Sequence, residues 1–368
     1  MSVRDRLRAS LCELMSIPGL SGHEDRVRRR IQAQLGELGI ASRSDPLGNL
    51  IASLEGDPDT PRVMVFTHMD QLGFVVRKIE GDGFVRVDRL GGVPERALPS
   101  QAVLFCVGEG RDVAGVLANK SHHATTAEEK YRVVPCSELY IDTGFASADA
   151  VRAAGIRVGT PVVYLPRVLT LAEGRLAGTS VDDRAGCAVM LELAGLLKGQ
   201  SHLPSVHLVF SVQEEYNLRG ALPAAQALRP DIAIQLDLVL AADAPDMRDR
   251  GDVMLGGGPA MSLYSFHGRG TLNGVIPHPA MVHLFEETAR AESLPLQRSA
   301  HIGLLTDLSY VQFTGAGVAS IDMGFPMRYS HSSLEVCDLQ DLEQLVLLLA
   351  AALPRIDRNF SLERDAYT

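Results

Sequence analysis

The sequence contains no tryptophan, and only 5% of its 368 residues are aromatic. Because sites for sugars and quaternary amines depend on large aromatic faces, this scarcity disfavours a polysaccharide cleft. The sequence also has no excess of basic residues: it contains 35 Lys and Arg and 45 Asp and Glu, which gives a formal net charge of −10. A nucleic-acid groove needs clustered cations to replace counterions. We therefore expect no nucleic acid among its partners.

Two further patterns are missing. The five cysteines are scattered and form no C-x-x-C pair, which favours reduced thiols over a disulfide framework. No apolar run approaches the roughly 18 residues of a membrane span, and the N-terminus lacks the apolar stretch of a signal peptide. These absences predict a cytoplasmic protein with no membrane partner.

Helix and strand patterns alternate near both ends of the chain. Val63–Thr67 is a nearly continuous apolar run, typical of a strand buried on both faces of a sheet. The S-x-x-E pattern from Ser21 to Glu24 predicts a capping box that opens a helix reaching Leu38. This alternation favours an α/β fold with a mixed, mainly parallel sheet covered by helices.

The middle of the chain, residues 72–165, has a different pattern. Short β-rich runs follow one another at a spacing of roughly 8–12 residues, separated by glycine and charged turn residues. Such spacing predicts a small β-barrel or sandwich. We therefore expect one α/β domain made of residues 1–71 and 166–368, with a β-rich domain of residues 72–165 inserted into it.

Five short segments place histidine or acidic residues just after an apolar strand or at a turn beside a helix. In an open α/β sheet, ligands bind at the carboxyl ends of the strands, so these segments are expected to meet at one edge. The candidate residues are His68, Asp70, Asp182, Glu214, Glu215, Asp237 and His331.

These residue types suit a metal centre. Imidazole and carboxylate are the usual non-thiol ligands of Zn²⁺, and they also suit Co²⁺ or Mn²⁺. Two histidines and three carboxylates can hold two ions if one carboxylate bridges them, and a further carboxylate can act as general base. Each segment alone has an ordinary explanation, such as a helix N-cap at Asp182 or a solvated pair at Glu214 and Glu215. Five such segments together favour a single site.

The same segments resemble those of the M42 family of dinuclear metallo-aminopeptidases, which includes glutamyl and tetrahedral aminopeptidases. The similar stretches are T-H-M-D-Q-L-G-F-V-V (67–76), V-D-D-R-A-G (181–186), Q-E-E-Y-N-L-R-G-A (213–221), Q-L-D (235–237) and M-R-Y-S-H-S (327–332). The resemblance runs essentially from end to end. It implies an α/β catalytic domain into which a small PDZ-like β-barrel domain is inserted, with the barrel contributing to dimerisation and oligomerisation.

The resemblance also implies a role for each candidate residue. It makes His68 and Asp237 ligands of one ion, Glu215 and His331 ligands of the second, and Asp182 the bridge between them. Two further residues would be catalytic without being ligands: Glu214 as general base, and Asp70 as the group that orients the His68 imidazole. The Asp182–Asp183 peptide is expected to be cis. The implied cofactor is two divalent cations per chain. Zn²⁺ or Co²⁺ is expected before Mn²⁺, which also suits these ligands.

The activity implied is removal of N-terminal residues from short peptides by two-metal water activation. The implied assembly is a homo-oligomer of dimers, up to a tetrahedral dodecamer. Three other functions stay open: an N-acyl amino acid deacylase on the same site, a glycoside hydrolase such as a glucanase, and a non-catalytic shell protein. Tyr216, Asn217 and Gly257 depart from the common motifs and leave the preferred N-terminal residue of the substrate open. The role of the polar His122-His123 pair is also open: it lies either in a loop with no part in the site or in a loop that contributes to a neighbouring subunit's site.

Overall fold

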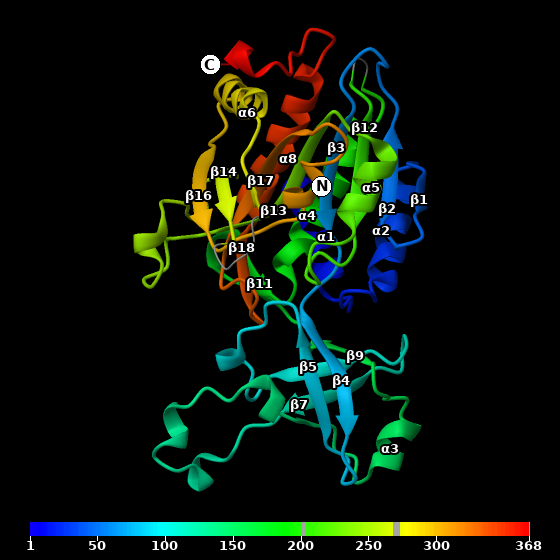
Figure 1. The fold of residues 1–368 in the computed structure, drawn as a ribbon, viewed down its shortest axis with the longest axis vertical. Helices are drawn as coiled ribbons and strands as arrows, with labels where there is room; N and C mark the ends of the chain where they lie inside the picture. The colour runs from blue at the N-terminus through cyan, green and yellow to red at the C-terminus, as the bar shows by residue number, and fades with distance from the viewer. Residues whose placement is uncertain (201–202, 268–272, 368) are drawn as a thin grey trace.

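The computed structural model describes residues 1–200, 203–267 and 273–367. Figure 1 shows two parts, a larger one with helices around a sheet and a smaller β-rich one below it. The chain enters the smaller part after strand β3 (Val63–His68) and leaves it before strand β10 (Val168–Thr170). Both ends of the chain therefore build the larger part. The domain boundaries at residues 72 and 165 stay a prediction.

Within the described residues, twelve strands form one mixed sheet. Its four central strands lie in the order β12-β3-β13-β17 and are parallel to one another. Antiparallel pairs flank them on both sides. The strands are β1 (Ser42–Ser44), β2 (Leu50–Leu54), β3, β10, β11 (Arg175–Gly178), β12 (Val206–Ser211), β13 (Ile232–Leu240), β14 (Ala260–Phe266), β15 (Gly274–Val275), β16 (Gln297–Ile302), β17 (Ala319–Arg328) and β18 (Glu335–Asp338). The mixed α/β fold class is confirmed, with the parallel strands at its centre.

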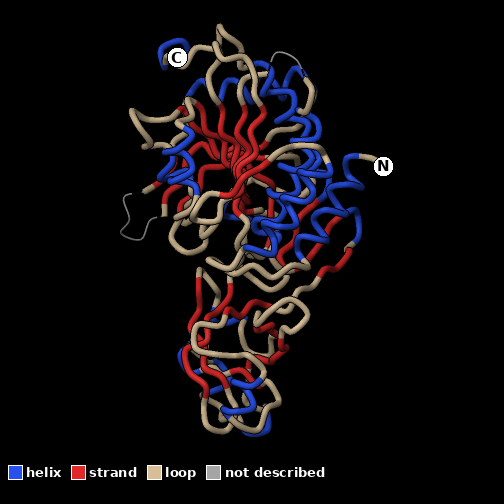
Figure 2. The backbone as a smooth tube through the Cα atoms, turned by 90° about the vertical axis from the view of Figure 1, so that its right-hand side faces the viewer, coloured by secondary structure: helices blue, strands red, loops and turns tan. Residues whose placement is uncertain are grey.

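Helices cover both faces of the sheet (Figure 2). They are α1 (Val3–Met15), α2 (Asp25–Glu37), α4 (Val181–Leu197), α5 (Ala221–Leu228), α6 (Pro279–Glu292), α7 (Leu308–Val311) and α8 (Leu339–Ala352). Val63 and Val65 of β3 join a core that contains α1, α4 and α8, whereas Met64 and Phe66 join a core with α5 and α7. Burial on two faces explains why this strand is apolar at successive positions. No helix in the described part of the chain has an apolar stretch long enough to cross a bilayer.

The smaller part is a closed barrel of six strands, paired in the order β4-β5-β8-β7-β6-β9. The strands are β4 (Gly73–Ile79), β5 (Val85–Leu90), β6 (Ala102–Phe105), β7 (Val113–Leu117), β8 (Ile141–Asp142) and β9 (Pro161–Tyr164), and a short helix, α3 (Ala148–Ala153), precedes β9. Phe74 and Phe105 are fully buried at its core. Closure pairs the edge strands that an open sheet would expose, and it confirms the predicted β-barrel.

The predicted capping box before α2 is wrong. The Ser21 hydroxyl donates a 2.6 Å hydrogen bond to Asp70, and the Glu24 carboxylate accepts hydrogen bonds from the N–H groups of Gly22 and Gln213. Glu24 is itself the N-cap residue of α2, and no side chain caps that helix. Partners distant in sequence therefore outweigh the local motif and draw both side chains toward the edge of the sheet.

Asp341 of α8 ties that helix to the glycine loop before β14. Its buried carboxylate accepts 2.8 Å hydrogen bonds from the N–H groups of Gly256 and Gly258. We expect Asp341→Ala to lower the free energy of unfolding by about 2–4 kcal/mol, because two N–H groups lose their acceptor. Urea unfolding followed by circular dichroism measures this change. The control, Asp149→Ala, removes a carboxylate that is 96% exposed and should leave the midpoint unchanged; a wild-type midpoint for Asp341→Ala would contradict the expectation.

Candidate metal centre

The first predicted site residues lie where two parallel strands end. His68 is the last residue of β3 and pairs in register with Ser211, the last residue of β12. Glu214 and Glu215 come three and four residues after the end of β12, so the parallel pairing brings them to the same edge as His68. This is the carboxyl edge on which ligands of such sheets bind.

The remaining candidates reach this edge from other elements. His331 follows strand β17, and Asp182 lies in the first turn of α4. Asp237 does not follow its strand as predicted, because β13 continues to Leu240. The apolar residues after Asp237 extend the strand, so its carboxylate projects from within β13, where it is buried.

The structure brings the five predicted ligands into two groups that share one residue. One group is His68, Asp182 and Asp237, and the other is Asp182, Glu215 and His331; within each group the ligand atoms all lie within 4.8 Å of one another. Asp182 Oδ1 is 3.1 Å from His68 Nε2, and Asp182 Oδ2 is 3.5 Å from His331 Nε2. The two oxygens of one carboxylate thus face two different imidazoles, which is the arrangement expected of a bridging ligand.

The backbone beside these residues adopts uncommon conformations. Ser180, Gln213 and His331 have φ angles of 58°, 59° and 66°. A left-handed backbone in a residue with a side chain costs on the order of 1–3 kcal/mol and is concentrated at functional sites. The Asp182–Asp183 peptide bond is cis, which confirms the expectation drawn from the family resemblance.

Asp70 is buried behind the site and binds more groups than the sequence indicates. Its carboxylate accepts 3.0 Å hydrogen bonds from the N–H groups of Glu214 and Glu215 as well as the bond from Ser21. Its Oδ1 is 3.5 Å from His68 Nδ1, whereas its backbone carbonyl lies closer, at 3.1 Å. Because a carbonyl only accepts, His68 Nδ1–H donates to it and leaves Nε2 free for a ligand role.

Glu335, the first residue of β18, is a functional candidate that the sequence interpretation missed. It is only 2% exposed. One carboxylate oxygen accepts a 3.0 Å hydrogen bond from the Asp182 N–H, and the other accepts a 2.8 Å bond from the His331 N–H. Glu335 therefore fixes the backbone of two candidate ligands. An acidic residue beside the apolar Leu334 and Val336 was the available signal, the same signal that indicated Asp237.

The carboxyl groups of this edge are crowded together in a buried place. Burial, with added repulsion from Asp182, raises the pKa of Asp237 to about 7. Burial also raises the pKa of Glu214 and of Glu215 well above the usual range of a glutamate. Among the described residues, Glu215 Oε1 is buried without a hydrogen-bond partner. Imidazoles and carboxylates, one of them with an oxygen that has no hydrogen-bond donor, fit divalent cations such as Zn²⁺, Co²⁺ or Mn²⁺.

A cavity of about 320 Å³ opens above these groups. Four of the five candidate ligands line it together with the predicted base: Asp182, Glu215, Asp237, His331 and Glu214. Leu218, Leu304, Leu305 and Tyr310 contribute apolar or aromatic lining. Its size and mixed lining are those of a site for a small molecule or a chain end.

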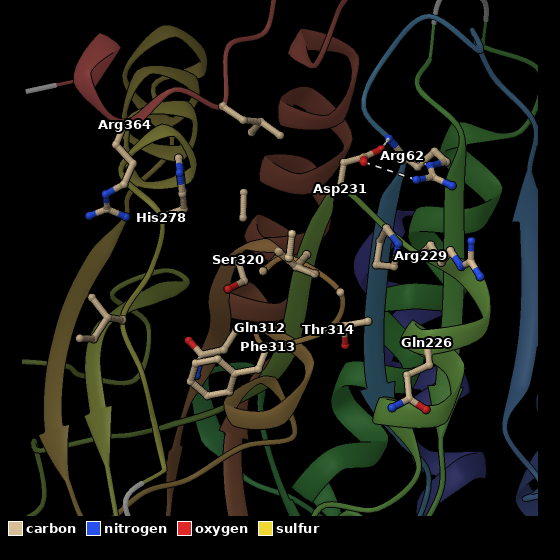
Figure 3. Close-up of a pocket in the computed structure, with 18 residues that line it drawn as sticks. Arg62, Gln226, Arg229, Asp231, His278, Gln312, Phe313, Thr314, Ser320 and Arg364 are labelled. Carbon is tan, nitrogen blue, oxygen red and sulfur yellow. Dashed lines mark hydrogen bonds and ion pairs between the residues drawn. The ribbon is translucent and has the colours of Figure 1, made fainter.

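A larger cavity, about 860 Å³, lies at the opposite edge of the sheet, near the start of β13 and β17 (Figure 3). Arg62 and Asp231 form an ion pair in it at 3.2 Å, and His278 lies across the cavity near Arg364 (Figure 3). None of the residues of the two metal-type groups lines this cavity. It is therefore separate from the candidate metal centre.

The His122-His123 pair lies in an exposed 3₁₀ turn of the barrel part, His122–Ala124. The two rings contact each other edge to face, with centroids 5.8 Å apart. Neither histidine belongs to a metal-type group in the part of the chain that the structure describes. The two metal-type groups of this chain therefore form without them.

Comparison with known proteins decides the family. The model of the M42 glutamyl aminopeptidase family matches residues 48–348, a range that includes every candidate site residue. The chain belongs to the M42 peptidase family. Lysyl aminopeptidase of Pyrococcus furiosus, a relative of this M42 chain, is 31% identical over 350 residues, covering 94% of this chain and 96% of that protein.

Solved structures agree with this assignment. The aminopeptidase APDkam598 from the archaeon Desulfurococcus kamchatkensis superimposes with a TM-score of 0.91 at 32% identity, covering 98% of this M42 chain and 97% of that one. The TET1 peptidase of Pyrococcus horikoshii has a TM-score of 0.84 at 26% identity and covers 96% of this chain and 99% of its own; it can assemble into a tetrahedron or a large octahedral shell. The fold read from the strands is thus the M42 peptidase fold.

Proposed function

We propose that this M42 peptidase is an aminopeptidase that removes N-terminal residues from short peptides at a centre of two divalent cations. Its family membership supports the peptidase activity. The observation that carries the two-cation centre is Asp182, whose two oxygens face His68 and His331 from separate ligand groups. A single carboxylate placed between two imidazoles in this way suits a pair of cations better than one.

The residues divide between the two cations as the geometry groups them. His68 and Asp237 would hold one cation, Glu215 and His331 would hold the other, and Asp182 would contribute to both; the two ligand groups support this division. Zn²⁺ and Co²⁺ suit this set best, and Mn²⁺ also fits. When bound, such a pair of cations polarises a carbonyl and activates water as a nucleophile.

Glu214 acts as the general base and then as the general acid. It belongs to neither ligand group, yet it lines the cavity, and its Oε2 is 3.9 Å from His68 Nε2. Burial, as the first cause, raises the pKa of Glu214 well above the usual range of a glutamate, which is the direction that favours a general base. The Glu214 carboxylate takes a proton from the attacking water and delivers it to the leaving amine. Asp70 supports this step by holding the Glu214 N–H.

Two other hydrolyses are less favoured. A glycoside hydrolase needs only a pair of carboxylates, and it gives no reason for two imidazoles to approach Asp182. An N-acyl amino acid deacylase would use the same centre, so the distinction depends on the substrate's amine. Family membership favours the peptide with a free N-terminus.

The barrel, residues 72–165, is proposed as the dimerisation and oligomerisation domain of a homo-oligomeric, cytoplasmic enzyme. The relative TET1 peptidase, which assembles into closed shells, supports a homo-oligomer. Dimers are the proposed building blocks, with a tetrahedral dodecamer as the largest assembly.

A panel of aminoacyl anilides tests this proposal. We expect turnover of substrates with a free amine in the presence of Zn²⁺, Co²⁺ or Mn²⁺, and at least about 100-fold slower turnover of the N-acetylated versions, because a blocked amine loses its contacts with the centre. Cellulose serves as the control for glycoside hydrolysis and should release no sugar. Release of acetate from the N-acetylated substrates, without release of aniline from the free-amine ones, would instead assign a deacylase.

A further inference from the structure

The loop that follows β5 of the barrel reaches the metal centre. Strand β5 ends at Leu90, and Gly91 and Gly92 come next. Gly92 lines the same cavity as the candidate ligands, and its carbonyl oxygen is 3.2 Å from His331 Nδ1. A backbone group of the barrel thus contacts a side chain of the larger part.

This contact determines which nitrogen of His331 is free. A carbonyl can only accept, so Nδ1–H is the donor to Gly92. The other nitrogen, Nε2, then keeps its lone pair and lies 3.5 Å from Asp182 and 3.7 Å from Glu215. His68 is held in the same way by the carbonyl of Asp70. The difference is that the carbonyl for His331 comes from the barrel.

The fit between Gly92 and the imidazole leaves no room for a side chain. A methyl group at Gly92 would lie 2.6 Å from His331 Nδ1 and 2.9 Å from its Cε1. The backbone angle at Gly92 is one that any residue adopts, so the need for glycine is one of space. The His331 side chain is 33% exposed. One side of the ring is therefore open, and the Gly92 carbonyl contacts its Nδ1.

The loop is itself held by the core of the barrel. A methyl group at Gly91 would lie 2.2 Å from a side-chain carbon of Leu72 and 3.4 Å from the backbone carbonyl of Glu215. Val93, just after the two glycines, is buried in the barrel core with Leu72. The loop is therefore packed between the barrel core and the edge of the sheet, and the barrel sets its position.

We propose that Gly92 is a positioning residue of the metal centre, through which the barrel orients His331 toward the cation shared by Asp182, Glu215 and His331. This inference rests on the proposed function only in naming the cation. The orientation of the imidazole is a property of the chain alone, and it can be measured without any metal.

The first experiment measures that orientation by ¹⁵N NMR of the His331 ring in metal-free protein. We expect the Nδ1–H tautomer in wild-type protein and a shift toward the other tautomer in Gly92→Ala. The matched control is Gly81→Ala in the β4–β5 turn, where the backbone is equally ordinary and a methyl group meets no described atom within 4 Å. An Nε2–H tautomer in the wild-type chain would overturn the proposal, even if Gly92→Ala failed to fold.

The second experiment measures cation binding by calorimetry and by the absorption spectrum of bound Co²⁺. We expect Gly92→Ala to weaken one of the two sites by about 10–100-fold, as when an outer partner of a metal ligand is lost, and Gly81→Ala to bind as wild type. Wild-type affinity at both sites of Gly92→Ala would overturn the proposal. Wild-type protein that binds no second cation while His331 keeps its Nδ1–H tautomer would instead overturn the two-cation function and leave the role of Gly92 standing.

Discussion

Replacing Glu214 with glutamine should lower kcat on an aminoacyl anilide by about 10²–10⁴-fold and leave cation binding unchanged. The carboxamide keeps the shape of the side chain but takes no proton from water. Because Glu214 belongs to neither ligand group, its loss removes no ligand. Steady-state kinetics measure the loss in kcat, and a metal count on the purified variant checks the cation content.

The matched control is Glu37→Gln, which makes the same substitution at a side chain that is 67% exposed near the end of α2. It should keep the wild-type rate. A Glu214→Gln enzyme with most of the wild-type turnover would contradict the assignment of the base. A variant that lost its cations would instead place Glu214 among the ligands.

Removing the cations with a chelator should abolish turnover and also lower Tm. The crowded, buried carboxyl groups of Asp182, Glu215 and Asp237 lose the positive charge that balances them. A site filled at about 1,000 times its Kd stabilises the fold by roughly 4 kcal/mol, which is about 5 °C for a chain of this size. Thermal unfolding with and without chelator measures the effect.

Adding back Zn²⁺ or Co²⁺ should restore activity and Tm, with an end point near two cations per chain. The matched variant is Asp182→Asn, which weakens the ligand shared by both groups. Its Tm should respond little to the chelator. A wild-type Tm and activity that the chelator leaves unchanged would contradict a metal centre here.

Local sequence patterns were sufficient for the fold class. The apolar run of β3 predicts a strand buried on two faces, and Val65 and Phe66 indeed join different cores. The short, evenly spaced runs of residues 72–165 predict a barrel, and a closed barrel is present. Strand β16 was not predicted, because its alternating burial includes polar residues and its place depends on pairing with the distant β14.

The candidate ligands could be predicted from residue types at strand ends. The residues that hold those ligands in place could not be found in the same way. His68 could be predicted because it directly follows the apolar run of β3. Glu335 was missed although its apolar neighbours gave a signal, because its contacts are to the backbone N–H groups of Asp182 and His331, and backbone groups carry no signature in a sequence. Ser21 misled for the reverse reason: a familiar local pattern was overridden by a carboxylate far along the chain.

The way the barrel is joined to the sheet limits how the protein can be rebuilt. Its first strand begins at Gly73, directly after the segment that contains His68 and Asp70, and its second strand leads to the Gly92 contact with His331. A chimera that received a foreign barrel would need both the same spacing after Asp70 and a carbonyl at the position of Gly92. Exchange of the barrel therefore has to preserve both the connection after Asp70 and the contact at Gly92. Designs that keep only the sheet will lack part of the framework of the candidate centre.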